Sequence, residues 1–209
     1  MASLLAASVL ALVASSARAQ PNQGAVSTHV PLSIAIVEDA GTPIVSETWL
    51  AERVTAANAI YGPSAIEFAV HATRSLDARH ADLVTRSDRH ALGREMLAHV
   101  VNVFVVRSLR DVDGSGYRQG VHWRPAGRPG AHFVIVSRDS GPSTLAHELG
   151  HFFGNGHSTT RGNLMSYDRG DGPPFFDATQ RRRIAQRLAL FLRTGELVAE
   201  RAVAPRITP

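Results

Sequence analysis

The sequence predicts a domain of the α+β class. It opens with a strand, a helix and a second strand, and later places short strands before two further helices. One run, at residues 100–106, is apolar apart from a single Asn, which predicts a central strand because a strand covered on both faces needs no polar alternation. Strands are expected at residues 32–37, 65–70, 100–106, 117–123 and 132–137.

The first helix is expected at residues 48–60. Ser46 or Thr48 can cap it, because a short hydroxyl side chain can accept a hydrogen bond from a free backbone N–H of the first turn. The sequence Tyr-Gly-Pro at 61–63 ends it. Its apolar residues recur at helical spacing, and we expect Trp49 among them to be a core residue. The predicted stripe is Trp49, Leu50, Val54, Ala57 and Ile60.

Two more helices complete the prediction, apart from the motif described below. A helix is expected at residues 87–97, in a polar stretch that carries few other signals. A C-terminal helix is expected at 177–192, where Asp177 can cap the first turn and Gln180 stands three residues further on, as in a capping box. The predicted apolar stripe of this last helix is Ile184, Leu188 and Leu192.

Composition places the chain among ordinary globular proteins. Of 209 residues, 44% are hydrophobic and 19% are charged, and the formal charge is only +4. The sequence pI is about 10.5 because all 22 basic side chains are arginine and there is no cysteine. This pI is weak evidence for nucleic-acid binding, and we expect no nucleic-acid partner. No disulfide framework can form, and the length suits one domain.

The first 19 residues predict a secretory signal peptide. An apolar run at 4–14 precedes Ala17-Arg18-Ala19, a small-residue cleavage pattern. The alternative, a membrane anchor, needs about 20 apolar residues. We therefore expect a secreted protein with no membrane attachment after cleavage, an extended lead-in at 20–30, one folded domain at 31–200 and a tail at 201–209.

Residues 147–157 carry the strongest chemical signal. His147 and His151 lie one helical turn apart on one face, so that both imidazoles can reach one ion. Glycine adopts the left-handed backbone that ends a helix, so Gly154 can turn the chain and bring His157 to the same ion. Three imidazoles suit a catalytic zinc, which keeps a fourth position for water. Glu148 would stand over that water and could take its proton.

This H-E-x-x-H-x-x-G-x-x-H stretch resembles the zinc-binding motif of the metzincin metalloproteases. Met165, eight residues after His157, is similar to the methionine of the metzincin Met-turn, which packs beneath the zinc. Tyr167 resembles the tyrosine of Met-x-Tyr in astacins, serralysins and pappalysins, where the hydroxyl helps to stabilise the tetrahedral intermediate. The alternative for Tyr167 is simple packing against the turn. The subfamily stays open, because the spacing from His157 to Met165 is matrixin-like and Met-Ser-Tyr is serralysin- or pappalysin-like.

The resemblance implies a specific architecture and activity. The fold would be a twisted, mostly parallel five-stranded sheet with an antiparallel edge strand, an active-site helix, a Met-turn and a C-terminal helix. The activity would be that of a monomeric, secreted zinc endopeptidase acting on protein or peptide substrates, with metal ligands His147, His151 and His157 and catalytic Glu148 and Tyr167. A narrow-specificity processing or toxin-like protease, and a catalytically idle zinc-binding module, remain as alternatives.

Other polar clusters were weighed as metal sites. Residues 111–116 resemble the opening of a calcium loop, but the twelfth position is His122 rather than an acid, and a plain polar turn is the preferred interpretation. A structural calcium therefore stays an alternative. His122 and His132 lack the spacing of the second zinc site of matrixins, so no second zinc is predicted. The remaining candidates, His71, His80 and His90, are expected to be surface residues.

Overall fold

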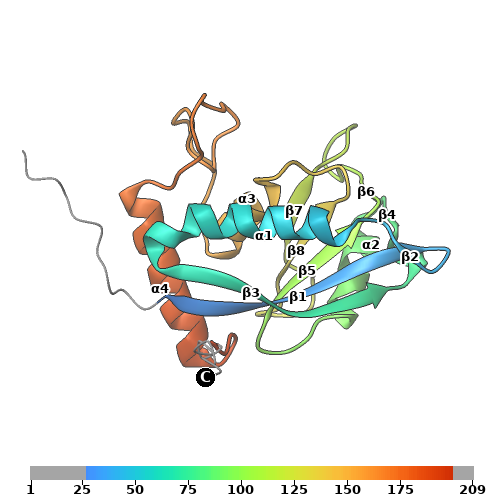
Figure 1. Cartoon of the computed structure of the whole chain (residues 1–209). Helices are drawn as coiled ribbons and strands as arrows, with labels where there is room; N and C mark the ends of the chain where they lie inside the picture. The colour runs from blue at the N-terminus through green and yellow to red at the C-terminus, as the bar shows by residue number, and fades with distance from the viewer. Residues whose placement is uncertain (1–26, 200–209) are drawn as a thin grey trace, which may run out of the picture.

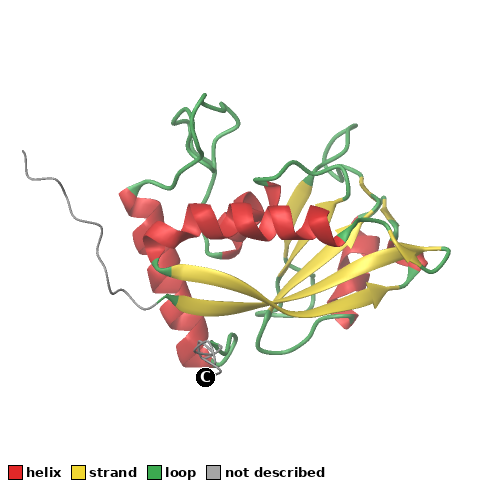
Figure 2. Ribbon diagram, viewed as in Figure 1, coloured by secondary structure: helices red, strands yellow, loops and turns green. Residues whose placement is uncertain are grey.

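The computed structural model describes residues 27–199, so the expected signal peptide, most of the lead-in and the tail lie outside the described residues. One twisted sheet forms the centre, with helices packed against its faces (Figures 1 and 2). The helices are α1 (Glu47–Tyr61), α2 (Arg86–Ala91), α3 (Thr144–Phe152) and α4 (Ala178–Thr194). The strands are β1 (Thr28–Asp39), β2 (Thr42–Pro43), β3 (Ile66–Leu76), β4 (Asp82–Leu83), β5 (Val101–Val106), β6 (Ser108–Leu109), β7 (Gly120–Trp123) and β8 (Phe133–Ser137).

The sheet confirms the predicted architecture. Its five long strands lie in the order β3-β1-β5-β8-β7, with the first four parallel and β7 antiparallel to β8 at the edge. The two-residue β2 pairs with the end of β1, and β4 and β6 form a separate small ladder. β1 begins four residues earlier than the expected Leu32, and β3 continues six residues beyond the expected end at Val70.

Strand β5 is buried on both faces, as its unbroken apolar run predicts. Val103 and Val105 point into the core shared with α1, α3 and α4, whereas Phe104 and Val106 point into a second core on the opposite face. Alternate side chains of a strand face opposite sides, so each core receives one half of the run. The central strands are thereby fixed between two apolar layers, and the edge strand β7 is left beside the site.

Helix α1 is anchored to the segment that leads into α3. Ser46 caps it, accepting a hydrogen bond from the Trp49 N–H at 3.1 Å. The Trp49 indole donates to the Arg138 carbonyl at 3.0 Å, and the buried Arg53 donates to the Ser140 carbonyl at 2.6 Å while stacking on the Trp49 ring. Trp49 is thus partly buried and packs against the core, consistent with its predicted role.

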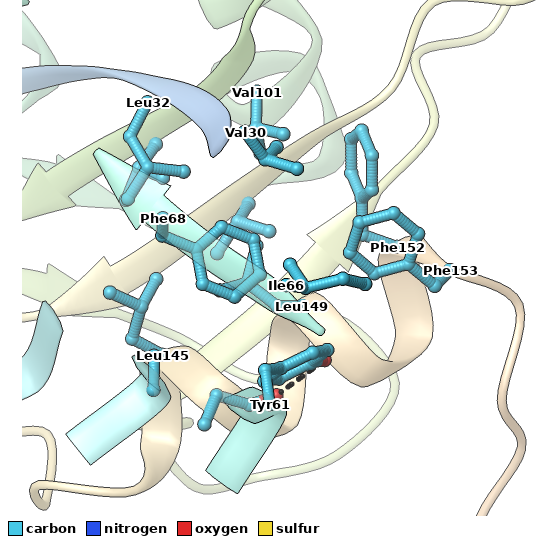
Figure 3. Close-up of a cluster of buried hydrophobic side chains, with 14 of the residues drawn as sticks. Val30, Leu32, Tyr61, Ile66, Phe68, Val101, Leu145, Leu149, Phe152 and Phe153 are labelled. Atoms are coloured by element: carbon cyan, nitrogen blue, oxygen red, sulfur yellow. Dashed lines mark hydrogen bonds between the residues drawn. The ribbon is translucent and has the colours of Figure 1, made fainter. Parts of the chain in front are cut away.

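An aromatic cluster supports α3 from below. The Tyr61 ring contacts Phe68 edge-on at 4.9 Å between centroids, with Phe153 nearby (Figure 3). The Phe176 ring also meets Tyr61 edge-on, at 5.0 Å. The Tyr61 hydroxyl donates to the Ala146 carbonyl at 3.2 Å, which gives the buried phenol a partner. The helix that carries the candidate metal ligands, α3, is therefore held in place by closely packed aromatic side chains.

The stretch at 71–98 departs most from the sequence prediction. The expected helix at 87–97 is a six-residue helix, α2, followed by a 3-10 turn over Leu92–Arg94, since Gly93 is a poor helix former. The surface prediction is wrong for His80, which is 5% exposed because it packs beside the second core and accepts a hydrogen bond from Arg79. His90 is half-buried and accepts from the Trp123 indole at 3.1 Å, whereas His71 is exposed as predicted.

The C-terminal helix follows its prediction closely. Asp177 and Gln180 form the reciprocal capping box, and Gly195 ends α4 in the left-handed conformation. Ile184 and Leu188 are buried as expected, but the third core residue is Phe191, and Leu192 is only partly buried. No helix within residues 27–199 has the length and apolar character needed to cross a membrane.

Candidate metal centre

Three histidines converge on one point above α3. His147 and His151 stand one turn apart on the helix, with ring centroids 4.8 Å apart, and His157 lies 4.7 Å from His151. The chain returns to them as predicted, because Gly154 adopts φ +85° just after the helix ends. One ligand nitrogen from each ring lies within 4.8 Å of the other two. Among residues 27–199 no other group of three such side chains meets this condition.

Backbone carbonyls set the tautomers of the two helical histidines. Nδ1 of His147 donates to the Leu164 carbonyl at 2.8 Å, and Nδ1 of His151 donates to the Asn155 carbonyl at 2.8 Å. A proton fixed on Nδ1 leaves the Nε2 lone pair free for a metal, which is the usual arrangement around histidine ligands. Nε2 of His151 and Nε2 of His157 face each other at 3.2 Å. The donor set therefore fits a borderline metal such as zinc.

Burial keeps these imidazoles in the form that binds metal. Loss of solvent lowers the pKa of His147 to about 4, and burial also lowers the pKa of His151. Both rings are therefore neutral at pH 7, and a metal need not displace a proton from them.

Glu148 faces the first residues of β7. Its side chain is 6% exposed and accepts a hydrogen bond from the backbone N–H of His122. Burial raises the pKa of Glu148 to about 7, while the His122 N–H and the charge of Arg118 act in the opposite direction. A carboxyl with this pKa can both accept and donate a proton near neutrality.

Gly120 leaves the space that Glu148 occupies. A Cβ at this glycine would stand 2.8 Å from Cγ of Glu148 and 2.8 Å from Cγ2 of Thr144, closer than carbon atoms approach without displacement. No local sequence pattern marks Gly120, because its partner is 28 positions away and only the folded edge strand brings the two together. The same holds for the backbone N–H of His122.

Met165 lies beneath the triad, as the resemblance implied. It is fully buried, and a Cβ on Gly150 of α3 would come within 2.5 Å of its sulfur. Asn163 shapes this turn by accepting from the Met165 N–H at 2.9 Å. The Asn163 amide also exchanges two hydrogen bonds with the Gln180 amide, at 2.7 and 3.1 Å. Gln180 thus caps α4 and holds the Met-turn, and only the first role was visible in the sequence.

Tyr167 is directed toward the triad. Its side chain is exposed, and its hydroxyl lies 3.0 Å from Nε2 of His157. Arg118 also reaches the hydroxyl, and it is held there by an ion pair of 2.8 Å with Asp111. The hydroxyl therefore stands at the nitrogen that would bind a metal, between a ligand and a cation.

The acidic turn at 111–116 does not offer a calcium site. Asp111 is bound by Arg118, and Asp113 forms an ion pair with Arg86. The Asp111 carboxylate also accepts from the backbone N–H of Asp113 at 3.0 Å, as in a polar turn. Because both carboxylates are already neutralised by arginine, the calcium alternative is not supported and the polar-turn interpretation is.

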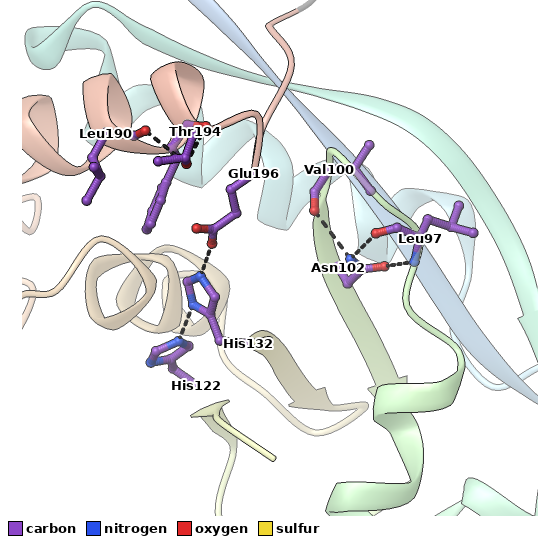
Figure 4. Close-up of polar contacts among 9 residues, drawn as sticks. Leu97, Val100, Asn102, His122, His132, Leu190, Thr194 and Glu196 are labelled. Atoms are coloured by element: carbon purple, nitrogen blue, oxygen red, sulfur yellow. Dashed lines mark hydrogen bonds and ion pairs between the residues drawn. The ribbon is translucent and has the colours of Figure 1, made fainter. Parts of the chain in front are cut away.

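A chain of polar side chains runs from β7 through the buried His132 to the segment after α4. Nε2 of His122 and Nδ1 of His132 are 2.8 Å apart, and the other nitrogen of His132 contacts the Glu196 carboxylate (Figure 4). Burial lowers the pKa of His122 to about 3, and burial also lowers that of His132, opposed by Glu196. The facing nitrogens of the two rings are hydrogen-bonded to each other, and the His132–Glu196 contact links β7 to the segment after α4.

Solved structures share this architecture. Archaemetzincin from Methanopyrus kandleri aligns with a TM-score of 0.53 at 21% identity, over 80% of this chain and 98% of that one. Mature mirolysin from Tannerella forsythia, solved with a cleaved peptide, aligns with 0.58 at 12% identity, over 82% and 99%. Metalloproteinase-II from Bacteroides fragilis aligns with 0.56 at 16% identity, over 80% of this chain. The chain has the metzincin fold.

At these sequence identities the likeness establishes the metzincin fold, and the activity has to be inferred from the residues of the site. The chain spans 55% of the length of metalloproteinase-II. No protein-family profile matches the sequence, and no curated protein matches it. Within the metzincin fold, the predicted residues His147, His151, His157, Glu148 and Tyr167 all meet in one cleft of about 900 Å³.

Proposed function

We propose that the protein is a zinc-dependent endopeptidase. The observation that carries this proposal is the convergence of three imidazole Nε2 atoms, two with their Nδ1 protons held by carbonyls, beside a buried glutamate in an open cleft. The proposed ligands are His147, His151 and His157, and the fourth position is left for water. Bound zinc would supply Lewis acidity toward the water and the scissile carbonyl.

Glu148 is the proposed general base and then general acid. Its carboxylate takes a proton from the attacking water as the water oxygen bonds to the carbonyl carbon. The same proton then passes to the amide nitrogen as the C–N bond breaks, so that an amine leaves. A pKa of about 7 suits both steps, and the hydrogen bond from the His122 N–H fixes the position of the carboxylate.

Tyr167 is the proposed donor to the developing oxyanion. Its hydroxyl can turn from His157 toward a substrate oxygen, and the guanidinium of Arg118 adds positive charge beside it. Donors directed at a developing negative charge are among the larger contributions to catalysis. This geometry favours the catalytic role over packing, because the ring is 68% exposed.

The edge strand β7 is the proposed holder of the substrate main chain. Among the described residues it pairs only with β8, so its other edge can bind an extended peptide by main-chain hydrogen bonds. A broad or a narrow, processing-type specificity is compatible with the same catalytic groups. The idle-module alternative is disfavoured because Glu148 is held in place beside the triad.

The expected signal peptide at 1–19 supports secretion, and a secreted, monomeric protein with no membrane attachment after cleavage is part of the proposal. A structural calcium is not part of it.

The test is cleavage of a mixed peptide library, with products identified by mass spectrometry. The parent protein should cut internal bonds, the Glu148→Ala variant should not, and the matched Glu67→Ala variant, at an exposed position on β3, should cut like the parent. No cleavage by a folded, zinc-loaded parent across both peptide and whole-protein mixtures would refute the endopeptidase proposal. Equal cleavage by Glu148→Ala would refute the role of Glu148.

A further inference from the structure

The candidate cleft is lined by more guanidinium groups than its carboxylates can neutralise. Asp111 is bound by Arg118, and Asp113 by Arg86, so neither acid is free to bind another cation. The remaining acid, Glu148, is turned toward the backbone of β7. The arginines that line the cleft are Arg89, Arg118, Arg124 and Arg169.

Arg169 stands beside the first metal ligand. Its guanidinium donates at 3.2 Å to the Leu164 carbonyl, the same carbonyl that accepts the Nδ1 proton of His147. Guanidinium has five N–H donors, and no carboxylate within residues 27–199 pairs with this one. Arg169 is exposed and lines the cleft that holds the triad, so its remaining donors are available to a ligand there.

Arg124 lies at the far end of the edge strand. It follows the last residue of β7, is exposed, and forms no ion pair or side-chain hydrogen bond with the rest of the described chain. Strands rise about 3.3 Å per residue, so Arg124 lies roughly 13 Å along β7 from Gly120, which faces Glu148. An extended peptide on β7 would pass Arg124 about four residues from the bond next to Glu148.

Arg89 differs from these two. It is buried, stacks on the Trp123 ring at 4.8 Å and donates to the Arg110 carbonyl. Its role is to support the end of β7 rather than to meet a ligand. The free positive charge of the cleft is therefore concentrated at Arg169 and Arg124, with Arg118 partly engaged.

We propose that the cleft selects acidic peptides, with Arg169 binding an Asp or Glu side chain next to the scissile bond and Arg124 binding a second one about four residues away. This inference rests on the proposed endopeptidase function and names its substrate class. Arginine matches a carboxylate with two parallel hydrogen bonds, which a neutral amide cannot accept in the same way. A lysine or arginine side chain at either position would meet a like charge.

Kinetics on matched peptides test the proposal. Cleaved bonds from the library identify a parent peptide, which is then made with Glu, Gln or Lys at the residues flanking the bond and four residues from it. We expect kcat/KM to be about tenfold higher for Glu than for Gln and lower still for Lys, with the preference shrinking at high salt. Equal rates for Glu and Gln, or a preference for Lys, would overturn the proposal while leaving the endopeptidase intact.

Variants assign the preference to the two arginines. Arg169→Gln should reduce the preference at the residue next to the bond, and Arg124→Gln should reduce it four residues away, each to about twofold. The matched control is Arg182→Gln, because Arg182 is exposed on α4, does not line the cleft, and forms a side-chain hydrogen bond with its helical neighbour Thr179. A preference for Glu that survives when both arginines are replaced by Gln, or that falls equally in the Arg182→Gln control, would contradict the assignment.

Binding provides a readout that does not depend on cleavage. Zinc-loaded Glu148→Ala protein is titrated with a fluorescent decapeptide of alternating Glu and Ala, and with the Gln and Ala analogue. We expect about tenfold tighter binding of the Glu peptide, lost in the Arg124→Gln, Arg169→Gln double variant and kept in Arg182→Gln. Because zinc is the same in all three proteins, direct carboxylate binding to the metal cannot produce this pattern. If no peptide is ever cut, the endopeptidase proposal fails, and this comparison still decides the acidic selectivity.

Discussion

Replacing Gly120 by alanine should disable the site without removing its metal. The added methyl would lie 2.8 Å from Cγ and 3.0 Å from Oε1 of Glu148, and 2.8 Å from Thr144. Ordinary contacts begin near 3.5 Å, so something must move by more than half an ångström. Both residues belong to α3, but Glu148 is the more mobile partner because its long side chain can swing its carboxylate, whereas the β-branched Thr144 is stiff at its single side-chain torsion.

The expected magnitude follows from that displacement. Moving the Glu148 carboxylate also weakens its hydrogen bond from the His122 N–H, so the base loses both position and support. A misplacement of about 1 Å at a catalytic group can lower the rate on the order of 100-fold. Overpacking a closely packed site costs about 1–3 kcal/mol of unfolding free energy. We therefore expect kcat/KM to fall about 100-fold in Gly120→Ala, with kcat carrying most of the loss.

The assay combines steady-state cleavage of one library-derived peptide, zinc per chain and urea unfolding. The matched control is Gly116→Ala, in the same segment, where a Cβ would meet nothing within 4 Å. The control should keep its activity within about twofold, and both variants should hold one zinc. Parent-like kcat/KM in folded Gly120→Ala would refute the claim that the edge strand sets the position of Glu148.

Three further predictions concern the surroundings of the triad. Tyr167→Phe should lower kcat about 100-fold while the zinc content stays unchanged. Peptide-cleavage assays stopped at fixed times measure kcat, and an unchanged value would mean that the hydroxyl has only a packing role. His122→Gln should flatten the pH dependence of the free energy of unfolding. In the unfolded chain a histidine binds a proton below about pH 6.5, whereas folded His122 binds one only near pH 3. The parent therefore loses up to about 2 kcal/mol of unfolding free energy from this group between pH 7 and pH 5. Urea unfolding of metal-free protein at both pH values measures this, and identical slopes for parent and variant would contradict it. Gly150→Ala should destabilise the fold by about 1–3 kcal/mol, because the new methyl overlaps the Met165 sulfur; thermal unfolding unchanged within error would show that the turn can shift freely.

The features that could be predicted from the sequence are those that depend on residues close together in the chain. The zinc motif, the left-handed Gly154 and the capping box of α4 each depend on residues within eleven positions of one another, and the structure has all three arrangements. The mostly parallel five-stranded sheet with an antiparallel edge strand followed from the family resemblance, and the five long strands confirm it.

What the sequence missed depends on contacts between distant segments. His80 is buried next to Ala81, which belongs to a second core built largely from the distant strands β5 and β8, and no local pattern near residue 80 reveals that core. Arg53 occupies a core-facing position of α1 because the Ser140 carbonyl, 87 positions later, accepts a hydrogen bond from its guanidinium. The amide pair of Asn163 and Gln180 joins the Met-turn to α4, and each residue alone resembles an ordinary turn or cap residue.

The central claim is that His147, His151 and His157 hold one zinc ion together. The most direct measurement is zinc per chain combined with X-ray absorption at the zinc edge, on the parent, on His157→Gln and on the matched control His29→Gln. The account predicts one zinc per chain with three imidazole nitrogens at about 2.0–2.1 Å in parent and control. In His157→Gln, zinc affinity should fall at least about 100-fold. Folded parent protein that binds no zinc, or a His157→Gln variant that binds it as tightly as the parent, would contradict the account.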